Sequence, residues 1–182
     1  MVIFRGKRIK SDWCVGSPPN TIVRCSENGC INSDLLISWA ELFLNTFEDD
    51  LPRLLLLDGH ATHTYNFKFL EIMKSKNVYV SCFPSHTTHW LQAADKSFFR
   101  SLKSKWNEFG RKYIAETGGC HLPKSRFFEI FTPAWTAATK PETSIVEFRG
   151  TDTWHINVDS IPKSAYGPSL VTDRAYQPLD TA

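Results

Sequence analysis

Apolar residues along the chain form short runs and helical stripes. The run Leu54–Leu57 ends at Asp58–Gly59, and its four consecutive apolar residues predict a short strand buried on both faces. Residues 62–76 carry apolar side chains at helical spacing, and residues 78–83 are rich in β-branched and aromatic side chains. We therefore expect two parallel strands joined by a right-handed helical crossover.

The rest of the chain shows further strand, loop and helix patterns. They comprise an edge strand or half a hairpin at 2–10, mostly loop at 16–29, a helix capped by Asn32 or Ser33, a long helix at 94–117 and two shorter helices broken near Pro133 and Pro141. From Gly150 the composition shifts to small and polar residues, which predicts a loosely ordered tail over residues 150–182. Residues 1–149 are expected to form one α/β domain.

Two aspartates occupy positions that suggest a ligand-binding or catalytic site. Asp58 follows the carboxyl end of a predicted strand, where α/β folds bind ligands. Asp95 begins the long helix and, at about 100° per residue, lies within about 40° of the stripe that includes Trp106 and Tyr113. This phase predicts that Asp95 points inward, toward the sheet. The alternative is an N-cap or first-turn aspartate, which stabilises a helix by about 1 kcal/mol.

Four histidines lie beside these acids in two H-x-x-H pairs: His60, His63, His86 and His89. With Gln92, they are candidates to orient the acids through hydrogen bonds or to contact phosphate. Structural hydrogen bonds within two loops are an equal alternative. Zinc binding by mixed His and Asp ligands is a further one, although neither pair has the H-E-x-x-H pattern.

Basic residues border Asp95 on the long helix. Four of them fall within about 80° of arc: Lys96, Arg100, Lys103 and Arg111. The formal net charge of the chain is only +2, so affinity for nucleic acid depends on such local clustering. A solvated helix face is the ordinary explanation of a basic run. Because these residues flank an acid, a surface for a phosphate backbone is the second explanation.

Composition narrows the class of protein. The 182 residues are 42% hydrophobic and 13% aromatic, which suits one globular domain that buries about 70% of its unfolded surface. No apolar run is long enough for a membrane span or a secretory signal. The five cysteines show no C-x-x-C spacing, which indicates buried or free thiols in a reducing compartment.

The segments LLLLDGHATH and FPSHTTHWLQAADKSFFRSLKSKW resemble the catalytic core of DDE-superfamily endonucleases. The resemblance is strongest to transposases of the pogo, Tigger and jerky type, relatives of centromere protein B. The two acid-bearing motifs occur in the family's order, and 36 residues separate Asp58 from Asp95. Similar sequences read L-Q-P-L-D where this chain has L-Q-A-A-D. The resemblance implies a ribonuclease-H-like mixed sheet with flanking helices, a nuclear location, DNA as partner, and Mg²⁺ or Mn²⁺ bound by both aspartates.

The family's two-metal chemistry uses three acids, of which Asp58 and Asp95 match two. Asp12 lies in a loop-like segment that is poorly placed to be the third. We therefore expect an incomplete domain that lacks the first catalytic strand and does not cleave DNA by itself. The alternatives are a host-adopted or decayed remnant that binds DNA or protein without catalysis, and a His/Asp zinc protein. The oligomeric state is left open.

Overall fold

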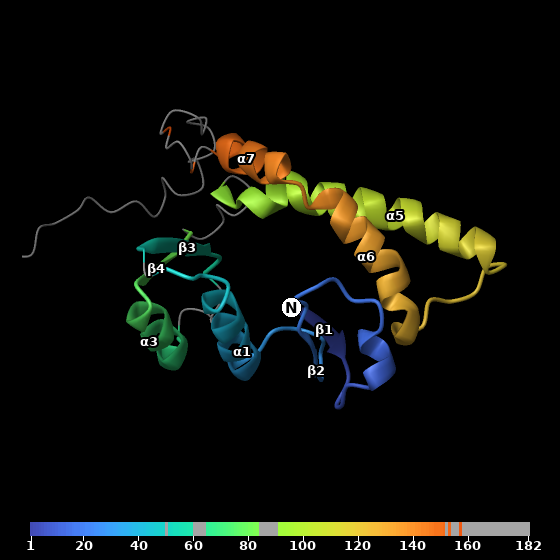
Figure 1. The fold of residues 1–182 in the computed structure, drawn as a ribbon, viewed down its shortest axis with the longest axis horizontal. Helices are drawn as coiled ribbons and strands as arrows, with labels where there is room; N and C mark the ends of the chain where they lie inside the picture. Colours follow the sequence, from blue (N-terminus) through green and yellow to red (C-terminus); the bar gives the residue numbers. More distant parts are fainter. Residues whose placement is uncertain (50, 60–64, 84–90, 152, 154–156, 158–182) are drawn as a thin grey trace, which may run out of the picture.

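The computed structural model describes residues 1–49, 51–59, 65–83, 91–151, 153 and 157. The elements follow the chain in the order β1 (Val2–Arg5), η1 (Ser11–Cys14), β2 (Val23–Ser26), α1 (Ser33–Leu44), β3 (Arg53–Leu57), α3 (Phe67–Ser75), β4 (Val78–Cys82), η2 (Ala94–Phe98), α5 (Phe99–Glu116), η3 (Lys124–Arg126), α6 (Phe127–Ala138) and α7 (Pro141–Gly150). Figure 1 shows two separate strand pairs, with α5 and α7 above them and α6 descending beside β1 and β2.

The first strand pair lies at the amino-terminal end. β1 and β2 are parallel, with Val2 opposite Val23 and Arg5 opposite Ser26. Of the two alternatives expected at 2–10, the edge strand is confirmed over Val2–Arg5, and the half hairpin is wrong because the partner strand is parallel. The expectation that residues 16–29 are mostly loop missed β2. This strand is only four residues long and begins with its single strongly apolar residue, so its conformation depends on pairing with β1.

The second strand pair confirms the predicted parallel crossover. β3 and β4 are parallel, with Arg53 opposite Val78 and Leu57 opposite Cys82, and α3 connects them. The expectation that this first strand is buried on both faces is wrong. Leu54 is 65% exposed, because this sheet has two strands in the described part of the chain. Helices α1 and α3 both lie below the pair in Figure 1.

One hydrophobic core joins this strand pair to its two helices. Its buried members come from α1, α3 and β4: Leu36, Ala40, Phe69, Met73 and Val78. An asparagine caps the amino end of each helix, as expected for the first. Asn32 Oδ1 accepts from Leu35 N at 2.9 Å, and Asn66 Oδ1 accepts from Phe69 N at 3.1 Å. Asn66 Nδ2 also donates to Ser33 O at 3.3 Å, which ties α3 to the start of α1.

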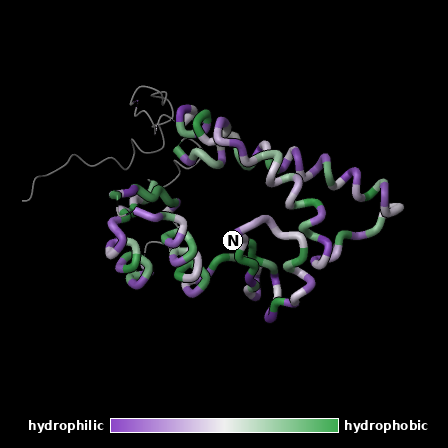
Figure 2. The backbone as a smooth tube through the Cα atoms, in the orientation of Figure 1, coloured by the Kyte–Doolittle hydropathy of each residue, from purple (hydrophilic) through white to green (hydrophobic). Residues whose placement is uncertain are grey.

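The carboxyl-terminal half is helical. The long helix opens with a π-helical turn, η2, and continues as α5. Figure 2 shows hydrophilic and hydrophobic positions alternating along α5, as the amphipathic pattern predicts. The expected break at Pro133 is wrong, because α6 runs through it from Phe127 to Ala138. The break at Pro141 is confirmed, since this residue occupies the first turn of α7.

A second core connects β1 and β2 to α6. Phe4, Val23 and Phe128 are its buried members. Phe127 packs edge-on against Phe4 at 5.1 Å between ring centroids, and its ring lies tilted at 39° to that of Trp106 of α5, at 5.2 Å. Phe127 of α6 therefore packs both on the β1–β2 pair and on the long helix.

The two cores share no residue. The protein is a mixed α/β protein, whereas the expected single mixed sheet is replaced, in the described part, by two parallel pairs. The expected tail at 150–182 lies almost entirely outside the described residues. All five cysteines are free thiols. No helix in the described ranges is long and apolar enough to cross a membrane.

Candidate active site and nucleic-acid interface

Asp58 lies directly after the carboxyl end of β3, as predicted. Leu57 O accepts from Phe83 N at 2.8 Å, so the β3–β4 pairing continues to the residue before the acid. The Asp58 side chain is half-buried, and its Oδ1 atom is shielded from solvent. The parallel pair therefore fixes where this carboxylate leaves the sheet.

Asp95 lies in the π-helical turn η2, and its side chain is exposed. The expectation that it points inward is wrong. The prediction assumed 100° per residue, whereas a π turn is wider and changes the direction of every residue before α5. The backbone N–H of Asp95 donates to Gln92 O at 3.1 Å, so Asp95 takes the first-turn position that was the alternative.

The approach of the two carboxylates stays a prediction. Residues 84–90, which lead from β4 toward η2, lie outside the described residues, and so do His60, His63, His86 and His89. Figure 1 shows the long helix beginning above the β3–β4 pair. Gln92, the remaining candidate beside the acids, is half-buried.

The two aspartates offer hard oxygen donors of the kind that Mg²⁺ and Mn²⁺ prefer. Within the described residues, no group of three or more His, Cys, Asp or Glu side chains comes together as a metal site. Asp58 and Asp95 are the residues that could hold such an ion, and their sharing one ion stays a prediction. Asp12, in η1, belongs to the β1–β2 end of the chain, and η1 contacts η3 and α6 there.

The cations of α5 divide into a paired and an unpaired face. Lys105 binds Glu108 at 2.8 Å, and Lys112 lies 3.9 Å from Glu116. The hydrogen bond from Lys105 is the main reason that the pKa of Glu108 is lowered. These two lysines lie outside the predicted basic stripe. Their charges are compensated locally, so they are poor candidates for phosphate contacts.

The stripe itself keeps its charge. Arg100, Lys103 and Arg111 are exposed, and no carboxylate of the described residues lies within ion-pair distance of them. Lys96 lies in η2, and its side chain is not among those that the structure describes. The three described members therefore form a basic face on α5 that makes no ion pair among the described residues, although the charge of Arg111 also helps to lower the pKa of Glu108. Such a face could contact phosphates.

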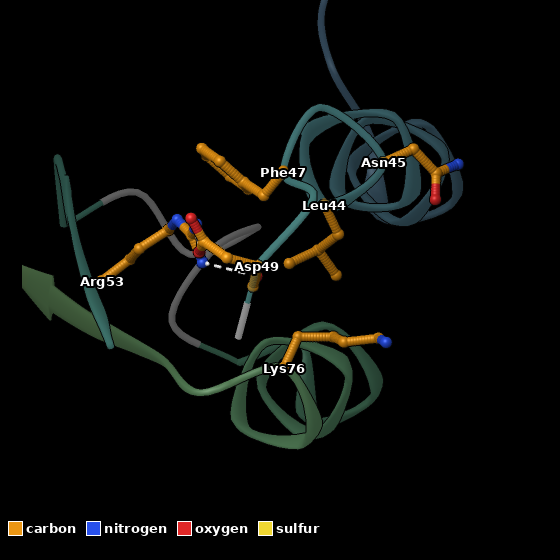
Figure 3. A pocket seen from close by; sticks show the side chains of 6 residues that line it. All are labelled: Leu44, Asn45, Phe47, Asp49, Arg53 and Lys76. Atoms are coloured by element: carbon orange, nitrogen blue, oxygen red, sulfur yellow. Dashed lines mark hydrogen bonds and ion pairs between the residues drawn. The ribbon is translucent and has the colours of Figure 1, made fainter. Parts of the chain in front are cut away.

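A small hollow of about 190 Å³ lies at the other end of β3. Figure 3 shows Asp49 facing Arg53, with Phe47 and Lys76 around them. The Arg53 guanidinium lies 3.9 Å from the centre of the Phe47 ring and pairs with Asp49. The pKa of Asp49 is lowered, first by the Leu51 N–H and then by Arg53. Because Arg53 begins β3 and Asp58 follows it, this hollow lies roughly 16 Å along the strand from the acid.

Sequence reasoning missed a second group of cations. Residues 5–10, RGKRIK, hold four basic residues before the first acid, Asp12. The density of charge in so short a segment was the available signal. The structure adds Lys124, whose Nζ donates to Arg5 O from a distant part of the sequence.

Comparison with known proteins identifies the family. The model of the DDE superfamily endonuclease family matches residues 1–147. The chain is also 28% identical over 153 residues to the MFS-type transporter clz9 of Cochliobolus lunatus; the match covers 82% of this chain and 16% of that protein. No solved structure matches the chain significantly. Since the family model extends from the first residue through most of α7, the chain belongs to the DDE superfamily endonuclease family.

Proposed function

We propose that the chain is the DNA-binding, two-acid part of a transposase-derived endonuclease domain of the pogo, Tigger and jerky type. The observation that carries the proposal is Asp58, half-buried at the carboxyl end of β3 in a parallel pair, within a chain of the endonuclease family. We also propose that the protein acts in the nucleus, where its substrate is found.

The chain's own residues have defined parts in this proposal. Asp58 is a metal ligand held by strand pairing, and Asp95 is a second ligand presented by the first turn of the long helix. Bound Mg²⁺ or Mn²⁺ would supply the charge that activates a nucleophile and stabilises a leaving oxygen. Arg100, Lys103 and Arg111 would hold the phosphate backbone beside the acids.

We further propose that the 182-residue chain does not cleave or join DNA. Two carboxylates match the family's acids, and Asp12 lies in η1, away from the β3–β4 pair. Without the third acid, which in the family bridges both metal ions, the transition state should lose several kcal/mol of stabilisation. Each 1.36 kcal/mol lowers the reaction rate tenfold. Activity should therefore fall below ordinary detection.

A supercoiled-plasmid nicking assay with Mg²⁺ and with Mn²⁺ tests this directly. The full chain is compared with Asp58→Ala and Asp95→Ala variants. We expect no nicking by any of the three proteins. Nicking by the unmodified chain that both substitutions abolish would contradict the proposed inactivity and would require a third ligand within these residues.

DNA binding by α5 is tested separately. We expect Arg100→Gln/Lys103→Gln/Arg111→Gln to weaken binding to a duplex of mixed sequence. The salt dependence of log K should become less steep by about two to three, because each lost phosphate contact contributes about 0.9. The control, Lys105→Gln/Lys112→Gln, removes two cations that are already paired, and the two-cation stripe variant Lys103→Gln/Arg111→Gln is compared with it at equal net charge. Equal effects of the two variants would contradict a specific role for the stripe.

A non-catalytic remnant that binds DNA is the second candidate function, and the basic stripe, which makes no ion pair among the described residues, favours it equally. The two candidates differ in metal binding. Weaker Mn²⁺ binding by Asp58→Asn than by the unmodified chain supports a retained catalytic site. Equal Mn²⁺ affinity of the two proteins supports the remnant. Zinc at one equivalent in protein purified without added metal would instead support the His/Asp zinc alternative.

A further inference from the structure

The segment between β1 and η1 carries the highest density of positive charge in the described chain. Arg5, Lys7, Arg8 and Lys10 are all exposed and fall within six residues. Lys124 of η3 joins them, and its Nζ lies 4.6 Å from the centre of the Trp13 ring. We name these five residues the β1–η1 basic surface.

The backbone of this surface is anchored at both ends. Gly6 N donates to Ser26 O at 2.8 Å, which extends the β1–β2 pairing into the segment. Trp13 N donates to Lys10 O at 3.1 Å, and the Trp13 ring packs edge-on against Phe4 at 5.5 Å between centroids. A Cβ at Gly6 would lie 3.6 Å from the Trp13 ring, so the tryptophan folds back over the glycine. The cations therefore project from a segment whose ends are fixed.

Lys124 shows that the surface is assembled by the fold. Its ammonium donates to Arg5 O, although the two residues are 119 positions apart in the sequence. The contact brings a fifth cation to a segment that already has four. Bringing like charges together is unfavourable unless solvent or a bound anion screens them.

The charge of this surface is not neutralised by ion pairs. Among the described residues, no carboxylate lies within ion-pair distance of any of its five members. The acids nearest in sequence to β1–β2 are Asp12 and Glu27, and both are exposed. Glu27 lines an open hollow of about 660 Å³ with Arg5, Ser26, Asn28 and Asn32. The surface thus keeps most of its positive charge beside a hollow with several hydrogen-bonding side chains.

The surface is separate from the basic stripe of α5. Figure 1 shows the segment after β1 at the lower edge of the molecule, whereas α5 crosses the upper part. A DNA duplex bound along α5 would therefore contact the β1–η1 basic surface only with phosphates other than those that α5 contacts.

We propose that the β1–η1 basic surface binds the phosphate backbone of double-stranded DNA, as a contact distinct from the α5 stripe. Lys7, Arg8, Lys10 and Lys124 supply the phosphate contacts. Arg5 begins the segment, and its backbone lies against Gly29, where φ is +79° and a Cβ would lie 3.4 Å from Arg5 N. The proposal shares with the proposed function only its partner, DNA, and does not depend on catalysis.

Variants of the 182-residue chain in which basic residues are replaced by glutamine provide the test. The surface variant is Lys7→Gln/Arg8→Gln/Lys10→Gln, with Lys124→Gln made alone. The control is Lys68→Gln/Lys74→Gln/Lys76→Gln, which lowers the net charge equally at exposed positions on and beside α3. Circular dichroism and thermal melting establish that each variant is folded. Binding to a 30-base-pair duplex of mixed sequence is then measured from 50 to 300 mM salt.

We expect the surface variant to bind the duplex about tenfold or more weakly at 0.1 M salt, with a salt slope less steep by about two to three. Lys124→Gln should lower the slope by about one, and the α3 control should change affinity less than twofold. Equal losses in the surface variant and the α3 control would overturn the proposal, because total charge alone would explain them. A loss that appears with duplex RNA and is absent with DNA would also overturn it.

The result for α5 keeps the two proposals distinct. Wild-type affinity in the surface variant, together with a loss in the α5 variant, would overturn this inference and leave the proposed function standing. The reverse result would leave the β1–η1 basic surface as the DNA contact and contradict the role of α5.

Discussion

Asp58 and Asp95 owe their positions to different kinds of local structure. Asp58 is the next residue after a strand whose pairing reaches Leu57, so its backbone is fixed by the sheet. Asp95 depends on a π-helical turn, which no spacing rule for an α-helix anticipates. The strand-end acid could therefore be placed from the sequence, whereas the direction of the helical acid could not.

Two large apolar residues near the β3–β4 pair differ in how deeply the structure buries them. Phe69 of α3 is fully buried, while Leu54 of β3 is 65% exposed. We expect Phe69→Ala to lower the free energy of unfolding by about 3–5 kcal/mol, through lost burial and a cavity. Leu54→Ala should change it by less than about 0.5 kcal/mol, as is usual at a surface.

Denaturant titration of both variants measures the difference. A large loss for Leu54→Ala would restore the expectation that β3 is buried on both faces. A small loss for Phe69→Ala would contradict the assignment of Phe69 to the core.

At the scale of elements, some helices and strands could be predicted from local sequence patterns, whereas others depend on tertiary contacts. The bounds of β4, the cap of α1 and the parallel crossover followed from patterns within about 30 residues. β2 did not, because its short polar sequence becomes a strand only beside β1. The path of α6 through Pro133 did not follow either, because packing of Phe127, Phe128 and Phe131 against neighbouring elements overrides the proline.

Pro133 should weaken α6 although the helix tolerates it. A proline inside a helix lacks the N–H that would bond four residues back, and its ring crowds that carbonyl. We expect Pro133→Ala to raise the free energy of unfolding by about 1–2 kcal/mol. Pro141→Ala is the matched control, since a proline in the first turn of α7 leaves no helical hydrogen bond unmade.

Guanidinium chloride titrations compare the two substitutions. Pro133→Ala should move the midpoint to higher denaturant, and Pro141→Ala should leave it unchanged or lower it slightly. Equal gains in the two variants would contradict the cost assigned to Pro133 inside the helix, because Pro141 leaves no helical hydrogen bond unmade.

The start of α6 carries a pH-dependent contact. Arg126 donates to both oxygens of Glu129 at 2.7 Å and lies 4.8 Å from the centre of the Tyr113 ring of α5. This hydrogen bonding lowers the pKa of Glu129 below its ordinary value of 4.5. A lowered carboxyl pKa contributes stability above the unfolded pKa, and that stability is lost as pH falls through the folded value.

We therefore expect Glu129→Gln to lower the melting temperature slightly at pH 7, with the difference from wild type shrinking as the pH falls below 4.5 and through the lowered pKa of Glu129. The effect should be small because both side chains are nearly half exposed. Glu142→Gln is the control, since Glu142 also lies in a first helical turn but has no ion pair within the described residues. A pH-independent difference for Glu129→Gln would contradict the role of the ion pair.

At the scale of the whole molecule, the division into two cores is the main feature that sequence patterns did not predict. Each two-stranded sheet is too small to be stable alone, so each depends on its own helices. α1 and α3 support β3–β4, while α6 supports β1–β2 and packs along α5. Local patterns predicted the β3–β4 pair, whereas the second core depends on packing of β1 and β2 against α6, which is distant in sequence and on which local periodicity carries no information.

Two cores without shared residues should unfold as two units. Phe69→Ala should speed amide hydrogen exchange in α1, α3, β3 and β4 and leave α5 and α6 near their wild-type rates, because its cavity lies in the first core. Phe128→Ala should do the reverse, since Phe128 is buried between α6 and the β1–β2 pair. Hydrogen exchange followed by mass spectrometry at peptide resolution measures both patterns in the full chain. Faster exchange across both halves in either variant would contradict the division and would mean that the protein opens as one cooperative unit.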